Sequence, residues 1–237
     1  MRIKSLSFDM DTAGLPINEV NQLYQNFWVN KKYDWWYEVL PDDIVVDIGA
    51  GIGMFSAKAL DAGAKKVYMI EPNRRLLKAA IKNVSDYIMD TDDSPVVPIN
   101  AVMGKTDIHR GNIYKSTVYN DEEVEDVKLM TLTEFVGKYD LAHIDFMKID
   151  AEGAELDFLI DHLDYFSAHV RHAAINVHID TLPVTYERFW NFRHKFIKPF
   201  HDTNRLRFMD ESLREKVFSE TPLRLLPKES MIYITNY

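Results

Sequence analysis

The sequence predicts an α/β fold with a mostly parallel, doubly wound sheet and an antiparallel C-terminal edge. Short apolar runs alternate with helix-like stretches from residue 44 onward, an order that is typical of βαβ units and a parallel sheet. The first run, residues 44–48, leads directly into a turn with glycine at three of its five positions, residues 49–53. Two late runs, residues 205–209 and 231–235, are expected to pair with each other as the antiparallel edge.

The composition is that of an ordinary globular protein, and it excludes several function classes. The chain has 237 residues, of which 46% are hydrophobic and 27% are charged, which is enough for one large domain. We expect an N-terminal helical cover over residues 1–40 and an α/β domain over residues 41–237. The chain has no cysteine, which excludes disulfides, a cysteine-based zinc site and a thiolate nucleophile.

The charge and the hydropathy limit the expected partners. The net charge is −9 at pH 7, and a negative surface repels a phosphate backbone, so no nucleic acid partner is expected. The first residues carry no apolar stretch for a signal peptide, and no run approaches the ~20 apolar residues of a membrane span. We therefore expect a cytoplasmic protein without a membrane partner.

The first elements follow in order along the chain. After the first strand, a helix is expected to end near Gly63, and residues 66–70 form the second strand. The next helix is indicated by apolar residues at helical spacing, namely Leu76, Leu77, Ala80, Ile81 and Val84. The third strand, residues 96–100, contains Pro98, which cannot donate to a central ladder and so weakens a place in the middle of the sheet.

The second half continues the alternation. Five acidic side chains within residues 120–126 indicate a solvated loop or hairpin tip. Residues 131–135 open a short helix, with Thr133 as its expected N-cap. The remaining elements are expected at residues 146–149 (strand), 153–166 (helix), 172–178 (strand) and 186–196 (aromatic amphipathic helix).

Residues 18–39 are helical in pattern and dense in aromatic side chains. Two interpretations stay open: one or two helices packed on the sheet, or a cover that excludes water from an active site and shapes a substrate pocket. If Trp28, Trp35 or Trp36 line such a pocket, their faces suit a flat or sugar-ring acceptor.

The glycine-rich turn predicts a ligand site, because glycines let the backbone turn sharply and approach a ligand closely. Ligands of doubly wound folds lie at the carboxyl ends of the strands. Met54 stands where a dinucleotide fingerprint has its third glycine. The spacing from Asp47 through Gly49, Gly51 and Gly53 instead resembles motif I of class I methyltransferases, which implies a Rossmann-like fold and S-adenosylmethionine as the methyl donor.

Glu71 ends the second strand, where a carboxylate can accept both ribose hydroxyls of an adenosine cofactor. This position suits nicotinamide dinucleotides and S-adenosylmethionine alike. Asn100 and Ala101 end the third strand on the side expected for adenine, and Asn100 could bond the adenine edge or form a turn. The residues expected to bind the cofactor are Asp47, Gly49, Ala50, Gly51, Gly53, Phe55, Glu71, Pro72, Asn100, Ala101 and Asp150.

Residues 148–155, with the sequence KIDAEGAE, indicate one particular family among the class I methyltransferases. They closely resemble the K-x-D-x-E-G-x-E block of the FkbM-type methyltransferases. Residues 101–104 and 131–135 resemble the same family's small-residue turn and its T-L-D-E-F segment. The resemblance covers about residues 44–178. It implies a class I fold and methyl transfer from S-adenosylmethionine, usually to an oxygen, often a hydroxyl of a sugar or natural product.

The chain also departs from that family. The family's fifth strand commonly ends in E-x-H, whereas residues 176–178 here are Asn-Val-His, so the glutamate is missing. Its absence supports an alternative function, a catalytically degenerate subunit that binds S-adenosylmethionine for a partner. Met54 disfavours a nicotinamide oxidoreductase, and residues 150–153 lack the D/N-P-P-Y/F motif of base methyltransferases. Our main interpretation is O-methylation of a hydroxyl on a sugar or small molecule.

Methyl transfer to a hydroxyl requires a group that removes the hydroxyl proton. Asp150 is the first candidate for a catalytic or acceptor-orienting residue, although it could instead cap the following helix. Glu152 lies in the first turn of that helix, where the macrodipole favours acids. His178 has an unperturbed pKa suited to a base near neutral pH, and Asp180 follows it at the same end of the sheet.

Lys148 lies inside a mostly apolar strand, where an unpaired charge is costly. We expect it to pair with Asp47, with Glu155 or with another acid, or to reach out at the end of the strand. The side chains that could converge on a divalent metal are Asp150, Glu155, Asn176 and His178. The sequence does not require a metal, and none is expected.

Overall fold

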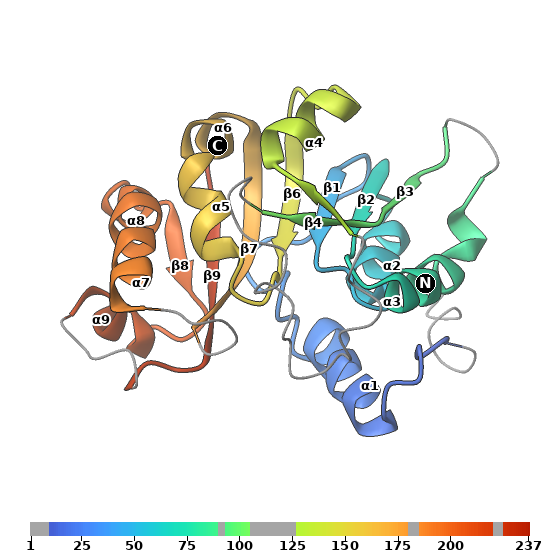
Figure 1. The fold of residues 1–237 in the computed structure, drawn as a ribbon, viewed down its shortest axis with the longest axis horizontal. Coiled ribbons are helices and arrows are strands. Elements are labelled where there is room, and N and C mark those ends of the chain that lie inside the picture. The colour runs from blue at the N-terminus through green and yellow to red at the C-terminus, as the bar shows by residue number, and fades with distance from the viewer. Residues whose placement is uncertain (1–9, 90–92, 105–126, 180–184, 220–224) are drawn as a thin grey trace.

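The computed structural model describes residues 10–89, 93–104, 127–179, 185–219 and 225–237. The acidic stretch at residues 120–126 and the candidate Asp180 lie outside the described residues. A seven-stranded sheet forms the centre of the described part of the chain, in the order β3-β2-β1-β6-β7-β9-β8 (Figure 1). These strands are β3 (Val96–Ile99), β2 (Lys66–Ile70), β1 (Ile44–Ile48), β6 (Ile144–Ile149), β7 (Val170–His178), β9 (Glu229–Thr235) and β8 (Leu206–Phe208).

The strand directions confirm the predicted sheet. Neighbours from β3 to β7 are parallel, and β9 is antiparallel to both β7 and β8. Pro98 lies in β3 at the edge, paired only with β2, where a missing N–H is tolerated. A separate short parallel pair, β4 (Ala101–Met103) and β5 (Lys128–Met130), follows β3. Two expectations need correction here: β3 ends at Ile99, and residues 101–103 are a strand and not the turn that the family resemblance implied. The sequence pattern did not indicate β5.

Helices cover both faces of the sheet, as a doubly wound fold requires. Successive strand side chains point to opposite faces, so Val45 and Val46 belong to different apolar clusters. The first face carries α1 (Ile17–Tyr24), the π-helical turn η1 (Gln25–Val29), α2 (Met54–Asp61), α3 (Arg74–Asn83) and η2 (Ser85–Tyr87). The second face carries α4 (Leu132–Tyr139), α5 (Glu155–Asp161), α6 (Leu163–His169), α7 (Tyr186–Phe192), η4 (Arg193–Ile197), α8 (Lys198–Asp202) and α9 (Ser212–Phe218).

Three helix predictions need correction. The N-cap of α4 is Thr131 and not Thr133: Thr131 Oγ1 accepts from the Glu134 N–H at 3.1 Å, and Glu134 Oε2 accepts from the Thr131 N–H at 2.8 Å, which is a capping box. The helix expected at residues 153–166 is two helices, α5 and α6, with a break at His162. The helix expected at residues 186–196 changes from α7 into the π-helical turn η4 at Arg193.

We call residues 10–39 the N-terminal segment. Its helical part ends at Val29, so the helical pattern expected to continue to Val39 is wrong for residues 30–39, which form turns and irregular backbone. Phe27 and Tyr33 of this segment belong to the same apolar cluster as Val45 of β1. The Lys58 ammonium of α2 donates to Phe27 O at 2.7 Å. The segment is therefore packed on the sheet rather than detached from it.

Among the described residues, no helix combines the length and the apolar character that crossing a membrane requires.

Candidate functional site

The turn after β1 favours glycine at three positions because of its backbone angles, and at two of them also because a side chain would collide with its neighbours. Gly49, Gly51 and Gly53 have φ angles of 75°, 57° and 82°, in the left-handed region that favours glycine. A Cβ on Gly49 would lie 1.9 Å from Asp150 O, and one on Gly53 would lie 3.0 Å from Ala80. A Cβ on Gly51 would meet nothing within 4 Å. Gly49 and Gly53 therefore permit packing, whereas Gly51 leaves its side of the turn open.

Glu71 ties this turn to the next one. Its Oε2 accepts from the Gly51 N–H, and its Oε1 accepts from the Asn73 N–H, both at 2.8 Å. Asn73 in turn caps α3, because its Oδ1 accepts from the N–H groups of Arg75 and Leu76. Glu71 is only 6% exposed. Burial raises the pKa of Glu71 to about 7, although the two backbone N–H donors and the charge of Lys148 oppose that rise.

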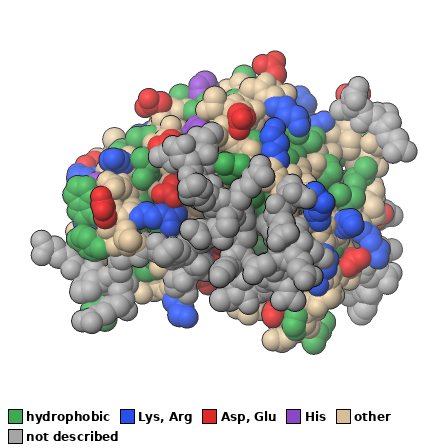
Figure 2. Space-filling view, viewed as in Figure 1, with side chains coloured by type: hydrophobic (Ala, Val, Ile, Leu, Met, Phe, Trp, Pro, Cys, Tyr) green, Lys and Arg blue, Asp and Glu red, His purple; other side chains and the backbone are tan. Residues whose placement is uncertain are grey.

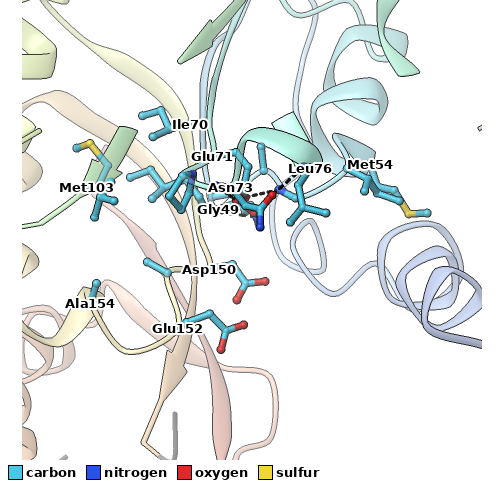
Figure 3. A pocket seen from close by; sticks show the side chains of 18 of the residues that line it. Gly49, Met54, Ile70, Glu71, Asn73, Leu76, Met103, Asp150, Glu152 and Ala154 are labelled. Atoms are coloured by element: carbon cyan, nitrogen blue, oxygen red, sulfur yellow. Dashed lines mark hydrogen bonds between the residues drawn. The ribbon is translucent and has the colours of Figure 1, made fainter. Parts of the chain in front are cut away.

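A cavity opens beside this turn, and Figure 3 shows Gly49, Glu71, Asp150 and Glu152 around it. The predicted cofactor residues that line the cavity are Gly49, Ala50, Gly51, Glu71, Pro72, Ala101 and Asp150. Apolar side chains supply most of the remaining wall, among them Leu15, Leu23, Phe27, Leu76, Val102 and Met103. The first three come from the N-terminal segment, which therefore covers part of the cavity.

The other predicted cofactor residues, Asp47, Gly53, Phe55 and Asn100, lie outside this lining. Gly53 packs on α3, and Phe55 lies against Phe146 of β6. Asn100 Nδ2 donates to the backbone oxygens of Glu71 and Pro72 at 3.0 and 2.7 Å. Because its amide nitrogen bonds the chain itself, the contacts of Asn100 favour the turn-forming alternative over adenine binding.

Asp47 and Lys148 form a buried ion pair beneath the turn. They are partners in the β1–β6 register, and Lys148 Nζ lies 3.0 Å from Asp47 Oδ1, with both side chains at most 1% exposed. The prediction that Lys148 pairs with an acid is confirmed. Lys148 Nζ also donates to Gly49 O at 2.5 Å, and Asp47 Oδ2 accepts from Ser56 Oγ at 2.7 Å. Through these two hydrogen bonds, the pair holds the backbone of Gly49 in the turn and Ser56 in the first turn of α2.

Asp150 lies at the carboxyl end of β6, with one carboxylate oxygen toward the N-terminal segment and one toward β7. Oδ2 accepts a hydrogen bond from the Tyr33 hydroxyl, and Oδ1 accepts from Asn176 Nδ2 at 3.2 Å. Burial opposes the charged form, but the positive charges of Lys148, His178 and Lys32 outweigh it and lower the pKa of Asp150 to about 2. Asp150 is therefore a carboxylate at neutral pH.

His178 lies between carboxylates, which changes its predicted role. Its Nδ1 is 3.3 Å from Glu155 Oε1, and its Nε2 is 3.4 Å from Asp150 Oδ1. Burial disfavours the charged ring, but the hydrogen bond to Glu155 and the nearby carboxylates outweigh it and raise the pKa of His178 to about 10. These carboxylates favour the imidazolium, which has no free nitrogen lone pair, so the contacts weaken a role of His178 as the base. A catalytic role of His178 stays a prediction.

Glu152 lines the cavity next to Asp150, and the carboxylates of both project into it (Figure 3). Its φ angle of 53° is unusual for a residue with a side chain. Asp150, Glu152 and His178 each place one ligand-type atom within 4.8 Å of the others. Glu155, from the metal set considered above, is fully buried and accepts from the His178 and Gly153 N–H groups. That no metal is required stays a prediction.

Sequence reasoning missed two contributors to this site, Tyr33 and Glu229. Glu229, at the start of β9, is the register partner of His178, and its Oε2 accepts from Asn176 Nδ2 at 2.7 Å. Lys32 Nζ lies 3.0 Å from the same oxygen. Neither residue belongs to a motif. The density of aromatic residues in the N-terminal segment was the one signal that pointed toward Tyr33.

The tryptophans of the N-terminal segment lie elsewhere. Trp28 stacks on Tyr24, Trp35 lies against Tyr233, and Trp36 lies against Tyr37. None of the three belongs to the described cavity lining. Stacking by tryptophan therefore gives no support for a flat or sugar-ring acceptor.

Comparison with known proteins assigns the chain to a family. A family model described as the methyltransferase FkbM domain matches residues 47–218, which include the glycine-rich turn, Glu71 and residues 148–155. The chain belongs to the FkbM methyltransferase family. The resemblance found in the sequence is thereby confirmed, and the FkbM match extends beyond it to α9.

Two individual proteins place this FkbM domain among its relatives. The AMB antimetabolite synthetase AmbE of Pseudomonas aeruginosa is 27% identical, in a match that covers 70% of this chain and 10% of AmbE. The crystal structure of methyltransferase FkbM from Methylobacillus flagellatus KT has a TM-score of 0.50 and 19% identity, and the match covers 84% of this chain and 45% of that one. This chain thus spans less than half the length of either protein, and the structural match shows a shared Rossmann-like methyltransferase fold.

Proposed function

We propose that this FkbM domain transfers a methyl group from S-adenosylmethionine to a hydroxyl oxygen of a sugar or other small molecule. The observation that carries the proposal is one cavity with two kinds of wall. Gly49, Gly51 and Glu71 line one part of it, and the carboxylates of Asp150 and Glu152 line another. The first part suits an adenosine and the second suits a reacting hydroxyl.

The cavity suits this donor on three counts. The open side of Gly51 permits close approach of a ligand. Each Glu71 oxygen accepts one backbone N–H, and a carboxylate oxygen has a second lone pair for a ribose hydroxyl. The side chain of Met54 lines the cavity where a dinucleotide site needs glycine. When bound, S-adenosylmethionine supplies a methyl group on a positively charged sulfur, and nearby carboxylates favour such a cation.

Asp150 is the residue proposed to act on the acceptor. It is ionised at neutral pH, so it can accept a hydrogen bond from the acceptor hydroxyl and orient the oxygen for an in-line displacement. As the oxygen–methyl bond forms, the sulfur keeps the electron pair of the broken bond, and the hydroxyl proton passes to Asp150 and then to water. His178, as an imidazolium, holds the carboxylate in place and does not act as the base. Glu152 is proposed to bind the acceptor.

Two observations support a small molecule as the acceptor: the name of the relative AmbE and the charge of this chain. The name of AmbE describes the synthesis of an antimetabolite, a small molecule. On the face shown in Figure 2, Lys and Arg side chains are interspersed with Asp and Glu among the described residues. The net charge of −9 likewise favours a small acceptor over a nucleic acid backbone, for which a basic face is typical.

The alternative function, a degenerate subunit that binds S-adenosylmethionine without catalysis, has one support: Asn176 replaces a glutamate typical of the family. Glu229 weakens that support, because its Oε2 lies 4.0 Å from His178 Nε2 and bonds Asn176. A carboxylate from β9 is thus present where β7 lacks one.

The test is methyl transfer from S-adenosylmethionine with a radiolabelled methyl group to a panel of sugars and other small hydroxylated molecules. Label in an acceptor, lost in Asp150→Asn, is the expected result. Binding of the donor without transfer to any acceptor would favour the degenerate subunit. A thermal shift with NAD and none with S-adenosylhomocysteine would contradict both functions.

A further inference from the structure

Tyr33 connects the N-terminal segment to the proposed reaction site. Its ring lies in an aromatic cluster, 5.0 Å from the Phe27 ring and 6.0 Å from the Phe55 ring between centroids. Its hydroxyl donates to Asp150 Oδ2, across 117 residues of sequence. The residue is 2% exposed. A buried phenol with its hydroxyl on a carboxylate has one well-defined orientation, set by the ring packing.

The rest of the Asp150 carboxylate is held from the opposite side. Asn176 Nδ2 and His178 Nε2 both approach Oδ1, at 3.2 and 3.4 Å. Tyr33 is thus the described side chain that holds Oδ2, while β7 supplies the partners of Oδ1. A carboxylate held at both oxygens keeps its plane fixed, which is what orientation of an acceptor hydroxyl requires.

We propose that Tyr33 is a positioning residue of the methyl-transfer site, so that the N-terminal segment completes the catalytic apparatus instead of only covering the cavity. The proposal rests on the function proposed above for Asp150. Tyr33 does not touch the reacting atoms in this account. It acts through Asp150, by fixing the plane of the carboxylate and stabilising its ionised form.

Tyr33 suits this role because its hydroxyl stays protonated. Burial, followed by the charge of Asp150, raises the pKa of Tyr33 well above its usual value, so the phenol remains a hydrogen-bond donor at physiological pH. Hydrogen bonding to the charged form of an acid lowers its pKa. The charged or titratable groups that also act on Asp150 are Lys32, Lys148, Glu152 and His178, with Glu155 and Glu229 next to His178.

A second tyrosine provides a matched control. Tyr233 of β9 is also 2% exposed, and its hydroxyl donates to the backbone oxygen of Lys32, the neighbour of Tyr33. Tyr233→Phe removes a hydrogen bond that holds the N-terminal segment without removing any contact to Asp150. Tyr33→Phe keeps the ring packing and removes only the hydroxyl on Asp150. The two variants separate positioning of Asp150 from anchoring of the segment.

The first measurement needs no acceptor. The carboxyl carbon of Asp150 is followed by NMR during a pH titration of the full chain, and its signal is assigned by its loss in Asp150→Asn. In Tyr33→Phe we expect the titration midpoint to move upward by about one pH unit, and in Tyr233→Phe to stay at the wild-type value. An unchanged midpoint in Tyr33→Phe, or equal changes in both variants, would overturn the proposal.

The second measurement uses the best acceptor from the labelled-donor panel. Tyr33→Phe is expected to lower kcat by ~10–100-fold, with the Kd for S-adenosylhomocysteine within twofold of wild type, whereas Tyr233→Phe keeps kcat. A loss confined to the Kd would contradict a positioning role. If no acceptor is methylated, the proposed function fails, and the titration of Asp150 still decides whether Tyr33 controls that carboxylate.

Discussion

Glu71 Oε2 accepts a hydrogen bond from the backbone N–H of Gly51 at 2.8 Å. The contact joins the two features that the sequence indicated separately, the glycine-rich turn after β1 and the acid at the end of β2. It also orients the Glu71 carboxylate along the wall of the cavity.

Donor binding should depend on pH through Glu71. Without a ligand, burial raises the pKa of Glu71 to about 7, and ribose hydroxyls need the ionised form as acceptor. Affinity for S-adenosylhomocysteine should therefore fall as pH drops below about 7, by up to about tenfold per pH unit, and reach a plateau above it. Calorimetry from pH 5.5 to 8.5 checks this, and binding at pH 6.5 should release a proton. The charges of Asp47 and Lys148 also act on the pKa of Glu71. Glu71→Gln is therefore the control. If the affinity of this variant still falls with pH, a group other than Glu71 causes the pH dependence, and the prediction is wrong.

Two alanine substitutions in the glycine-rich turn should have opposite consequences. In Gly49→Ala the new Cβ meets Asp150 O at 1.9 Å, so we expect a loss of about 3 kcal/mol or more in the free energy of unfolding. In Gly51→Ala the Cβ has open space, so the loss should be about 1 kcal/mol, from the left-handed φ alone. Gly51→Ala should instead block donor binding. Urea denaturation and calorimetry measure the two effects, and similar unfolding energies for both variants would contradict this account.

The Asp47–Lys148 pair should matter more for stability than an exposed pair does. Lys148→Met leaves the Asp47 carboxylate buried without its partner, which should cost about 3–5 kcal/mol in the free energy of unfolding. The matched control is Lys198→Met in the exposed pair with Asp202, whose side chains are about half exposed, and this variant should unfold at nearly the wild-type urea concentration. Equal denaturation midpoints for the two variants would show that the buried pair does not stabilise the fold.

Much of the fold could be predicted because its signals are local. Apolar runs placed the sheet strands, and the glycine spacing placed the cavity. Lys148 could be paired with an acid because a buried charge in an apolar strand needs a partner. The prediction of Thr133 as the N-cap of α4 is wrong by two residues, because the reciprocal hydrogen bonds between Thr131 and Glu134 set where the helix begins.

The parts that could not be predicted depend on contacts between distant segments. Tyr33 and Asp150 are 117 residues apart, and neither ring packing nor a hydroxyl direction leaves a periodic pattern. Glu229 reaches the site only because β9 runs antiparallel to β7 in a register that pairs it with His178. The raised pKa of His178 has the same origin, since its carboxylate neighbours come from the end of β6, from α5 and from β9.

The most direct test of the central claim, that the glycine-rich turn and Glu71 bind the adenosyl part of a methyl donor, is calorimetry with S-adenosylhomocysteine. We expect saturable one-to-one binding to the wild-type chain, weaker by about 10- to 100-fold in Glu71→Gln, because Gln keeps one acceptor oxygen and loses one hydrogen bond to a charged group, which contributes about 1.5–3 kcal/mol. Circular dichroism should show that the variant remains folded. No heat of binding with folded wild-type protein, or the same Kd in both proteins, would contradict the claim.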